Sequence, residues 1–465
     1  MSPSSSFFTD DYNTGNRLST DIFAEKTRYS VMTQIDAINK YFSSLGSNLA
    51  DVGISLVNNE DKTTNPSPVA RKNKKQSPTL KIMWDFPSCS LGLKYTFQQI
   101  TGSTNGKQIE CIQKHLLNVC NTPIYEVNLE GIKSRDLIEL ILSVKSLQSL
   151  NLSDNNLRSL PSSIAQLSDL KKLNLAKNNL KIVPPQIQHL LNLEELDLSW
   201  NHISSYPDSP FILPNLKSLK LTGNLLRHWP SGLISHTQLE KLHINFNDLI
   251  DISQDISKLT SLKLLDLSGN HLEKIPHEIE YLHNLTTLNL SRNLLRSLPL
   301  QVFKLKNLTE LDASENNLTY IPEIFDVNRK LTTLILSQNM IKNLPENIGN
   351  LQCLKELDLS DNEISEDIDK LVNNTNLENL NLSGNCIKDR YEFVFDLSNL
   401  HTLDISENEI ETLPEISLIP LSKLNNLNLS ANIISELPER IWSLHSLKII
   451  NISHNYIKEL KRGLE

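Results

Sequence analysis

Leucine and isoleucine recur along most of the chain in one fixed pattern, L-x-x-L-x-L-x-x-N-x-L. The pattern is first complete over residues 147–157 and then returns every 23 residues, until one extra residue in 415–424 shifts the last two copies. A period held this tightly identifies an array of about fourteen full repeats. The asparagine of each copy marks the array: Asn155, Asn178, Asn201, Asn224, Asn247, Asn270, Asn293, Asn316, Asn339, Asn362, Asn385, Asn408, Asn432 and Asn455.

The two halves of each copy predict two different elements. The L-x-L core alternates and therefore predicts a short strand, with leucines on one face and polar residues on the other. The second half, L-P-x-x-I-x-x-L, as at residues 160–167, predicts an extended entry followed by a 3₁₀ or helical turn. Strands about 4.8 Å apart on one side and bulkier turns on the other give a curved stack. The fold class is an α/β solenoid, a horseshoe with a concave parallel sheet.

The repeated asparagines are expected to be structural. Each one ends a strand and turns inward, where its amide can donate to and accept from the backbone of adjacent copies. Such a ladder satisfies peptide groups that the turn would otherwise bury without a partner.

These 23-residue repeats resemble the intracellular Ras-group leucine-rich repeats, as in the leucine-rich scaffold of Ras–Raf signalling, Scribble and Erbin. The resemblance covers about residues 124–460. It implies a non-enzymatic protein-binding scaffold or adaptor in intracellular signalling, which uses the concave face of the array. It also implies a folded partner, with a Ras-like GTPase or a phosphatase catalytic subunit as first choices. Several bacterial effectors carry repeats of this length, so an effector that mimics a host scaffold remains an alternative.

The chain before the array divides into two parts. Residues 80–146 predict a small N-terminal cap, with strands at 81–86 and 93–97 and a helix at 108–119, followed by a degenerate first repeat over 123–146. Residues 1–79 are rich in Ser, Thr, Asn and Asp and predict a mostly disordered tail and linker. Apolar positions within 17–57 fit one face of a docking helix or a transiently helical tail. The repeat array itself takes 147–465.

Composition narrows the function classes. The 45 basic and 54 acidic residues give a net charge of −9, which argues against nucleic acid as the main partner. No apolar run of 18 residues and no secretory signal are found in the sequence, so neither a membrane span nor secretion is expected. The five cysteines show no paired spacing and are expected to be buried free thiols in a reducing compartment. We therefore expect a cytoplasmic protein, with the nucleus as an alternative because of the basic run at 71–75.

Catalytic and cofactor motifs are not found in the sequence. It carries no glycine-rich phosphate loop, no H-E-x-x-H and no kinase signature. Aspartates in the outward positions of the strands recur at least two strands apart, which is about 10 Å and too far for a shared metal ion. We expect no enzyme activity, no metal and no cofactor.

Departures from the repeat consensus cluster in the third to fifth copies and define the candidate binding site. Two aromatic residues precede the ladder asparagine, where other copies usually have Asp, Gly, Lys or Glu. Two basic residues replace the usual Asp or Asn four positions before it, and an asparagine and a further lysine lie beside them. Such a group fits a protein-binding hot spot, unless the aromatic rings fold back between adjacent turns. The residues are Trp200, Lys220, Lys241, His243, Asn245 and Phe246.

One short motif gives a further hypothesis. Lys81, Ile82 and Trp84 follow a basic run and are similar to the docking peptides that add as a strand to type-1 protein phosphatase. The resemblance implies a regulatory subunit of that phosphatase. The alternative is an ordinary capping strand.

Overall fold

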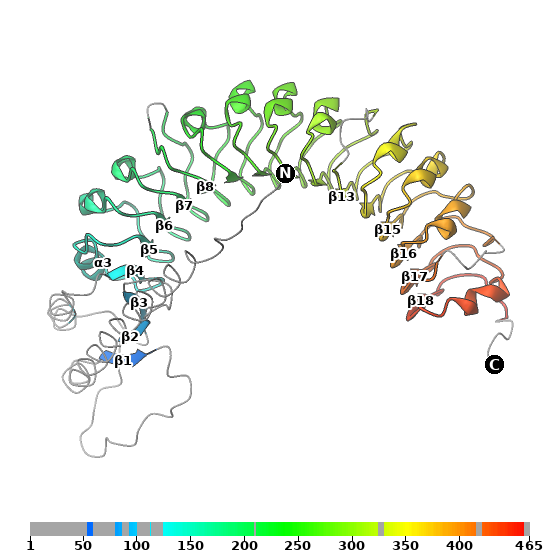
Figure 1. Ribbon diagram of the computed structural model, residues 1–465, viewed down its shortest axis with the longest axis horizontal. Helices are drawn as coiled ribbons and strands as arrows, with labels where there is room; N and C mark the ends of the chain where they lie inside the picture. Colours follow the sequence, from blue (N-terminus) through cyan, green and yellow to red (C-terminus); the bar gives the residue numbers. More distant parts are fainter. Residues whose placement is uncertain are drawn as a thin grey trace, which may run out of the picture. The chain divides into compact units, whose positions relative to one another are not determined.

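The computed structural model describes residues 124–459 apart from 209–210, 324–329 and 415–420, together with Ile112 and the backbone of three strands nearer the N-terminus. The chain forms two compact units (Figure 1). Unit 1 contains Met1–Asn155 and Pro161–Leu170, and unit 2 contains Asn156–Leu160 and Lys171–Glu465.

Unit 1 contains the predicted cap strands and the degenerate repeat. β2 pairs with β1 in parallel and with β3 in antiparallel orientation, and β4 pairs in parallel with both β3 and β5. The degenerate repeat has an α-helix after its strand, and the Ser134 hydroxyl caps it by accepting the Leu137 N–H at 3.4 Å. The elements are β1 (Ile54–Asn58), β2 (Leu80–Asp85), β3 (Leu93–Gln99), β4 (Ile124–Asn128), α3 (Arg135–Ile141), β5 (Ser149–Asn151) and η1 (Ser162–Gln166).

Two expectations for the N-terminal part are affected by this sheet. Residues 54–57, which the predicted helix over 17–57 includes, belong to a strand, because β1 starts at Ile54 and pairs with β2. The apolar residues at 54–57 fit a strand as well as the end of a helical face. Pairing with the neighbouring strand favours the strand. The rest of that prediction, and the helix predicted at 108–119 apart from Ile112, lie outside the described residues.

Unit 2 contains thirteen described three-residue strands, and every consecutive pair of them is parallel. Their central residue is the buried leucine of L-x-L, or Ile450 in the last copy, so the register advances by one repeat per strand. The strands are β6 (Lys172–Asn174), β7 (Glu195–Asp197), β8 (Ser218–Lys220), β9 (Lys241–His243), β10 (Leu264–Asp266), β11 (Thr287–Asn289), β12 (Glu310–Asp312), β13 (Thr333–Ile335), β14 (Glu356–Asp358), β15 (Asn379–Asn381), β16 (Thr402–Asp404), β17 (Asn426–Asn428) and β18 (Ile449–Asn451).

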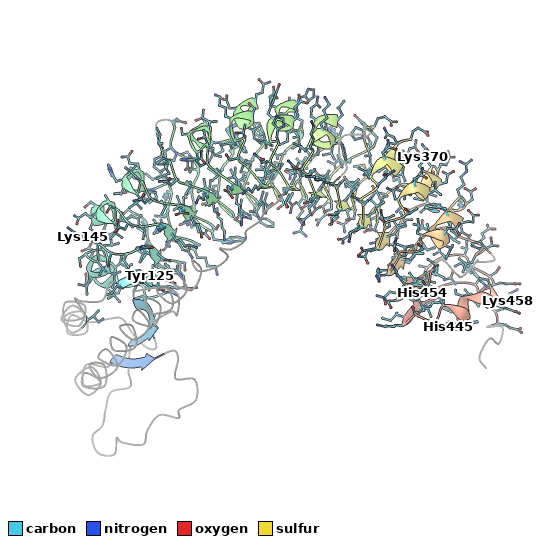
Figure 2. The ribbon with its side chains drawn as sticks, in the orientation of Figure 1. Tyr125, Lys145, Lys370, His445, His454 and Lys458 are labelled. Carbon is cyan, nitrogen blue, oxygen red and sulfur yellow. The ribbon has the colours of Figure 1, made fainter. Side chains whose placement is uncertain are left out.

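The second halves of nine copies in unit 2 form 3₁₀ turns, as predicted, whereas the described residues between β7 and β8 form none. Prolines such as Pro184 and Pro276 hold the extended residue before the turn. Within unit 2 the strands follow the inner side of the curve and the turns lie on its outer side (Figures 1 and 2). The turns are η2 (Pro185–His189), η3 (Ser231–Ser235), η4 (Gln254–Lys258), η5 (His277–Tyr281), η6 (Leu300–Lys304), η7 (Ile348–Asn350), η8 (Ile368–Asn373), η9 (Glu392–Asp396) and η10 (Glu439–Ser443).

The repeated leucines and asparagines together form the core between strands and turns. In a typical copy, Asn247 Nδ2 donates to the carbonyl oxygens of Leu221 at 2.9 Å and Ile244 at 3.0 Å, and Oδ1 accepts the Leu226 N–H at 3.1 Å. Asn247 is 5% exposed, so these bonds replace water for groups that the fold buries.

The cysteines differ from expectation in burial. Both cysteines in the described array are free, but Cys353 is exposed and Cys386 is half-buried. Cys353 lies in the segment between η7 and β14, where the side chain faces solvent instead of the leucine core.

Candidate protein-binding site on the inner face

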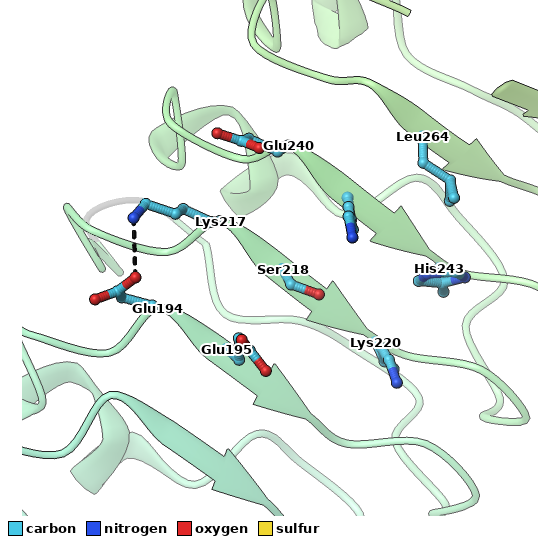
Figure 3. A pocket seen from close by; sticks show the side chains of 9 residues that line it. Glu194, Glu195, Lys217, Ser218, Lys220, Glu240, His243 and Leu264 are labelled. Carbon is cyan, nitrogen blue, oxygen red and sulfur yellow. Dashed lines mark hydrogen bonds and ion pairs between the residues drawn. The ribbon is translucent and has the colours of Figure 1, made fainter. Parts of the chain in front are cut away.

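The basic residues of the predicted site are brought together by strand pairing. Lys220 ends β8 and His243 ends β9, and the two residues are directly opposite each other in the parallel register. Lys241 lies opposite Ser218 at the other end of the same pair. All three line an open hollow of about 460 Å³ on the inner face of unit 2, over β7 to β10 (Figure 3).

Most copies have an acceptor where β8 and β9 have Lys220 and His243. Asp266 Oδ1, for example, accepts the N–H of Ser268 at 3.1 Å and its hydroxyl at 2.7 Å, and Asn289 does the same for Ser291. This Asx-type turn stabilises the residues that leave the strand. A lysine has no acceptor with which to make this bond. The Asp or Asn at the end of most strands therefore has a structural role, and this hydrogen bond is missing at Lys220.

The glutamates of the hollow are compensated within the array. Lys217 donates to Glu194 at 2.9 Å, and Lys263 donates to Glu240 at 2.8 Å. These hydrogen bonds hold the pKa of both carboxyls below the ordinary value of glutamate. Lys172 pairs with Glu195 at 2.7 Å. The carboxylates of the hollow are therefore charged and already have cationic partners.

The basic side chains of the site make longer contacts than the glutamates do. Lys220 Nζ lies 3.7 Å from Asp197 Oδ2, and His243 Nδ1 lies 3.7 Å from Asp266 Oδ2. Burial alone would raise the pKa of Asp266, but contacts with His243 and Ser268 outweigh it, so that this pKa lies below its ordinary value. Within the described residues, Lys241 has no carboxylate oxygen within the 4.0 Å of an ion pair. Its charge acts within the hollow by longer-range attraction, which contributes to the lowered pKa of Glu240.

Trp200 and Phe246 contact each other although they are two repeats apart. Their ring centroids are 6.4 Å apart, and the ring planes make an angle of 23°. This is an offset-stacked aromatic pair. The rings do not fold completely between adjacent turns, because Trp200 remains 54% exposed to solvent and Phe246 43% exposed. Together they form an apolar surface next to the hollow.

Glycine in the following copy makes room for each ring. A Cβ on Gly223 would lie 2.6 Å from Trp200 Cε3, and a Cβ on Gly269 would lie 2.7 Å from Phe246 Cδ1. Each ring therefore lies against the bare backbone of the next turn. The aromatic residues themselves have positive φ angles, 56° for Trp200 and 52° for Phe246, which bulky residues rarely adopt.

Asn245 has a structural contact. Its Oδ1 accepts the Thr222 hydroxyl at 2.6 Å, and its carbonyl accepts the Gly223 N–H at 3.0 Å. These bonds link the ends of β8 and β9 beneath the aromatic pair. Asn245 thus positions the backbone that carries Gly223, and its side-chain oxygen is already occupied.

Sequence reasoning missed two features. The aromatic–glycine relationship is visible as an aromatic residue followed by glycine exactly one repeat later, at 200 and 223 and again at 246 and 269. The second feature is a buried pair in which Tyr206 Oη lies 2.8 Å from His236 Nε2. Both residues replace a core leucine of the consensus in consecutive copies, and Phe211 packs edge-on against both rings. Burial lowers the pKa of His236 to about 4, so His236 is neutral at pH 7.

The proposed phosphatase-docking residues lie on β2. This strand has β1 on one edge and β3 on the other, so within the described backbone neither edge of residues 80–84 is free. A docking peptide of this type adds as an edge strand, which here requires one neighbour to leave.

Metal-binding clusters and membrane-spanning helices are not found among the described residues. Among the described residues, no group of three or more His, Cys, Asp or Glu side chains is placed to hold a metal ion. None of the described helices is both long and apolar enough to cross a membrane.

Comparison with protein families gives matches along the array. A family model described as "Leucine rich repeat" matches residues 145–203, 192–249, 237–295 and 283–341. Two further models match 375–418, as two copies of the repeat, and 350–367. No curated protein sequence matches the chain.

Solved structures with the same fold come from several kinds of protein. A leucine-rich repeat protein of Leptospira interrogans is 31% identical over 77% of this chain and 88% of its own, with a TM-score of 0.69. An internalin from Listeria monocytogenes is 25% identical over 62% of this chain and 82% of its own, with a TM-score of 0.55. The plant peptide hormone receptor RGFR1 in complex with RGF2 is 28% identical over 71% of this chain and 59% of its own, with a TM-score of 0.53. The repeat pattern, the parallel strands and these matches agree, and the chain belongs to the leucine-rich repeat family.

Proposed function

We propose that this protein is a non-enzymatic scaffold or adaptor that binds a folded partner protein on the inner face of unit 2. The observation that carries the proposal is the exposed pair of Trp200 and Phe246. Exposed aromatic rings that are held in one place lose little entropy when a partner covers them, and aromatic residues dominate binding hot spots. Both rings are fixed by the turns on which they lie.

The cost of the site within the array supports a binding role. Trp200 and Phe246 occupy a position that has a positive φ in every described copy of unit 2, where the other copies carry glycine, alanine or a polar residue, and Lys220 replaces an acceptor that other copies use. Neither substitution improves packing of the leucine core, since the side chains point away from it. Exposed apolar surface and a lost hydrogen bond, neither of which stabilises the fold, are expected where a protein binds something.

The proposed setting is intracellular signalling, with a Ras-like GTPase or a phosphatase catalytic subunit as the first partners to test. The resemblance of the 23-residue repeats to the Ras-group and the free cysteines support this setting. RGFR1 is a plant peptide hormone receptor whose structure was solved in complex with RGF2, which supports a binding role for an array of this fold. A bacterial effector that mimics a host scaffold is the alternative, favoured by the 31% identity to the Leptospira protein.

Paired substitution of the aromatic residues tests the proposal. Trp200→Ala with Phe246→Ala should weaken binding of a purified partner at least tenfold, because both anchors are removed. Alanine fits the backbone here, since Ala431 occupies the same repeat position with a φ of 52°. The matched control is Tyr281→Ala with Tyr320→Ala, which removes two similarly exposed aromatic rings outside the strands. Equal affinities for the wild type and the Trp200/Phe246 variant would contradict the proposal.

A further inference from the structure

The inner-face site combines two chemically different surfaces. Lys220, Lys241 and His243 present hydrogen-bond donors, whereas Trp200 and Phe246 present apolar rings. Lys220 ends β8 three residues before Gly223, on which the Trp200 ring lies. The two surfaces are therefore neighbours, since three residues at 3.3 Å each reach no more than about 10 Å.

Lys220 and His243 differ from the residues at the same position of the other strands. Along the other described strands of unit 2, the equivalent position is Asp or Asn, except for Ile335 on β13. An anionic ligand is thus attracted at β8 and β9, where Lys220 and His243 lie. It is repelled further along the same face, where this position has Asp312, Asp358 and Asp404. This charge pattern favours one position of an acidic segment on the face and disfavours the others.

Two lysines of the site, Lys220 and Lys241, can bind a further anion. Lys241 is exposed and has no carboxylate within ion-pair distance among the described residues. Lys220 is 49% exposed, and its contact with Asp197 is long at 3.7 Å. Both lysines can therefore turn to an incoming carboxylate without losing a short hydrogen bond.

We propose that the occupant of this site is an extended acidic segment of a partner protein. A carboxylate of the segment contacts Lys220, Lys241 and His243. An apolar side chain about two to four residues away along the segment covers Trp200 and Phe246. The inference rests on the proposed function and specifies its partner. Covering the rings excludes water from the adjacent cations, which strengthens their charge-assisted hydrogen bonds.

Labelled synthetic peptides of ten residues test the partner chemistry on the full chain by fluorescence anisotropy. The first set combines glutamates with a Leu-Phe pair, the second has glutamates only, and the third has the Leu-Phe pair with lysines. The first set should bind at least tenfold more tightly than the other two. Binding of the third set as tight as that of the first, or no binding of any set up to about 1 mM, would overturn the proposal.

A charge variant identifies the residues. Lys220→Asp with Lys241→Glu should weaken binding of the first set at least tenfold, and sister copies carry these residues, such as Asp197 and Glu195, so folding is retained. Lys304→Asp with Lys306→Glu makes the same charge change away from the strands and should have no effect. Unchanged binding by the Lys220/Lys241 variant would overturn the proposal. So would a phosphoserine set that binds tenfold more tightly than the glutamate set, since the site would then be one for phosphate.

The two proposals fail in different ways. If a purified partner is lost from the Trp200/Phe246 variant but retained by the Lys220/Lys241 variant, the binding site stands and the acidic partner does not. If both variants retain the partner, both proposals are wrong.

Discussion

The rings of Trp200 and Phe246 stack with their centroids 6.4 Å apart although the residues are separated by 46 positions in the sequence. Gly223 makes this contact possible, because the copy between them has no side chain at that position. An exposed aromatic pair is thus built from three consecutive copies of a repeat that otherwise carries polar residues, glycine or alanine there.

Adding a methyl group to Gly223 should disrupt the pair. Gly223→Ala places a Cβ against the Trp200 ring, which must move, and we expect roughly tenfold weaker partner binding. Gly384→Ala is the matched control, since Gly384 has a nearly equal φ (63° against 65°) but meets the Asp361 carboxylate, which can rotate away. Titration calorimetry with a purified partner measures both. Equal losses of affinity in the two variants would show that backbone strain, and not ring position, is responsible.

Restoring the consensus acceptor at the end of β8 should stabilise the protein. In Lys220→Asn the new Oδ1 can accept the Thr222 N–H, as Asn289 does for Ser291, and we expect the free energy of unfolding to rise by about 1 kcal/mol. Asn289→Lys makes the reverse change on β11 and should lower it by a similar amount. Urea unfolding midpoints give both values. A stabilised Lys220→Asn variant that binds its partner as tightly as the wild type would show that residue 220 does not contribute to binding.

Removal of a ladder amide should be costly in the middle of the array. Asn247→Ala leaves the Leu221 and Ile244 carbonyls and the Leu226 N–H without their partner, and we expect a loss of roughly 3 kcal/mol in the free energy of unfolding. Asn455→Ala should cost less, because Asn455 is only half-buried and water can replace its amide. Chemical denaturation of the two variants compares them. Equal destabilisation would contradict the structural role assigned to burial of the ladder.

Acid should destabilise the protein through His236. Its pKa is about 4 in the folded state and 6.5 when unperturbed, so between these values the unfolded chain binds a proton that the folded state does not. The free energy of unfolding therefore falls as the pH drops from 6.5 to 4, by at most roughly 3 kcal/mol from this group.

The control for this pH effect replaces the buried pair. His236→Leu restores the residue type that sister copies have, and Tyr206→Phe removes the hydroxyl that would lose its partner. The free energy of unfolding, measured with urea at pH 7, 6, 5 and 4, should fall less steeply with decreasing pH in the double variant than in the wild type. A pH dependence identical to that of the wild type would show that His236 is protonated without cost.

The sequence was sufficient for the architecture because every copy repeats the same physical solution. The L-x-L core, the L-P turn and the asparagine predict the strands β5 to β18 without tertiary information. It was insufficient where a position depends on its neighbour in space. Residues 54–57, the end of the predicted helix over 17–57, form a strand because β1 pairs with β2, which an isolated apolar pattern does not reveal.

The sequence predicted which residues form the candidate site, but not how all of their side chains contact one another. The period placed Lys220 opposite His243, since equivalent positions in adjacent copies pair. Contact between Trp200 and Phe246 depends on ring direction at positive φ and on the space over Gly223, neither of which the period specifies. Asn245, predicted as part of the binding surface, also accepts the Thr222 hydroxyl through its side-chain oxygen, a contact that the period does not specify.

Hydrogen exchange of the full chain with and without a purified partner tests most directly whether the inner face of unit 2 binds. We expect protection of backbone amides around Trp200, Gly223 and Phe246 in the complex, and none in the outer turns η4 and η5. Protection confined to the outer turns, with unchanged exchange at the ends of β7, β8 and β9, would contradict it.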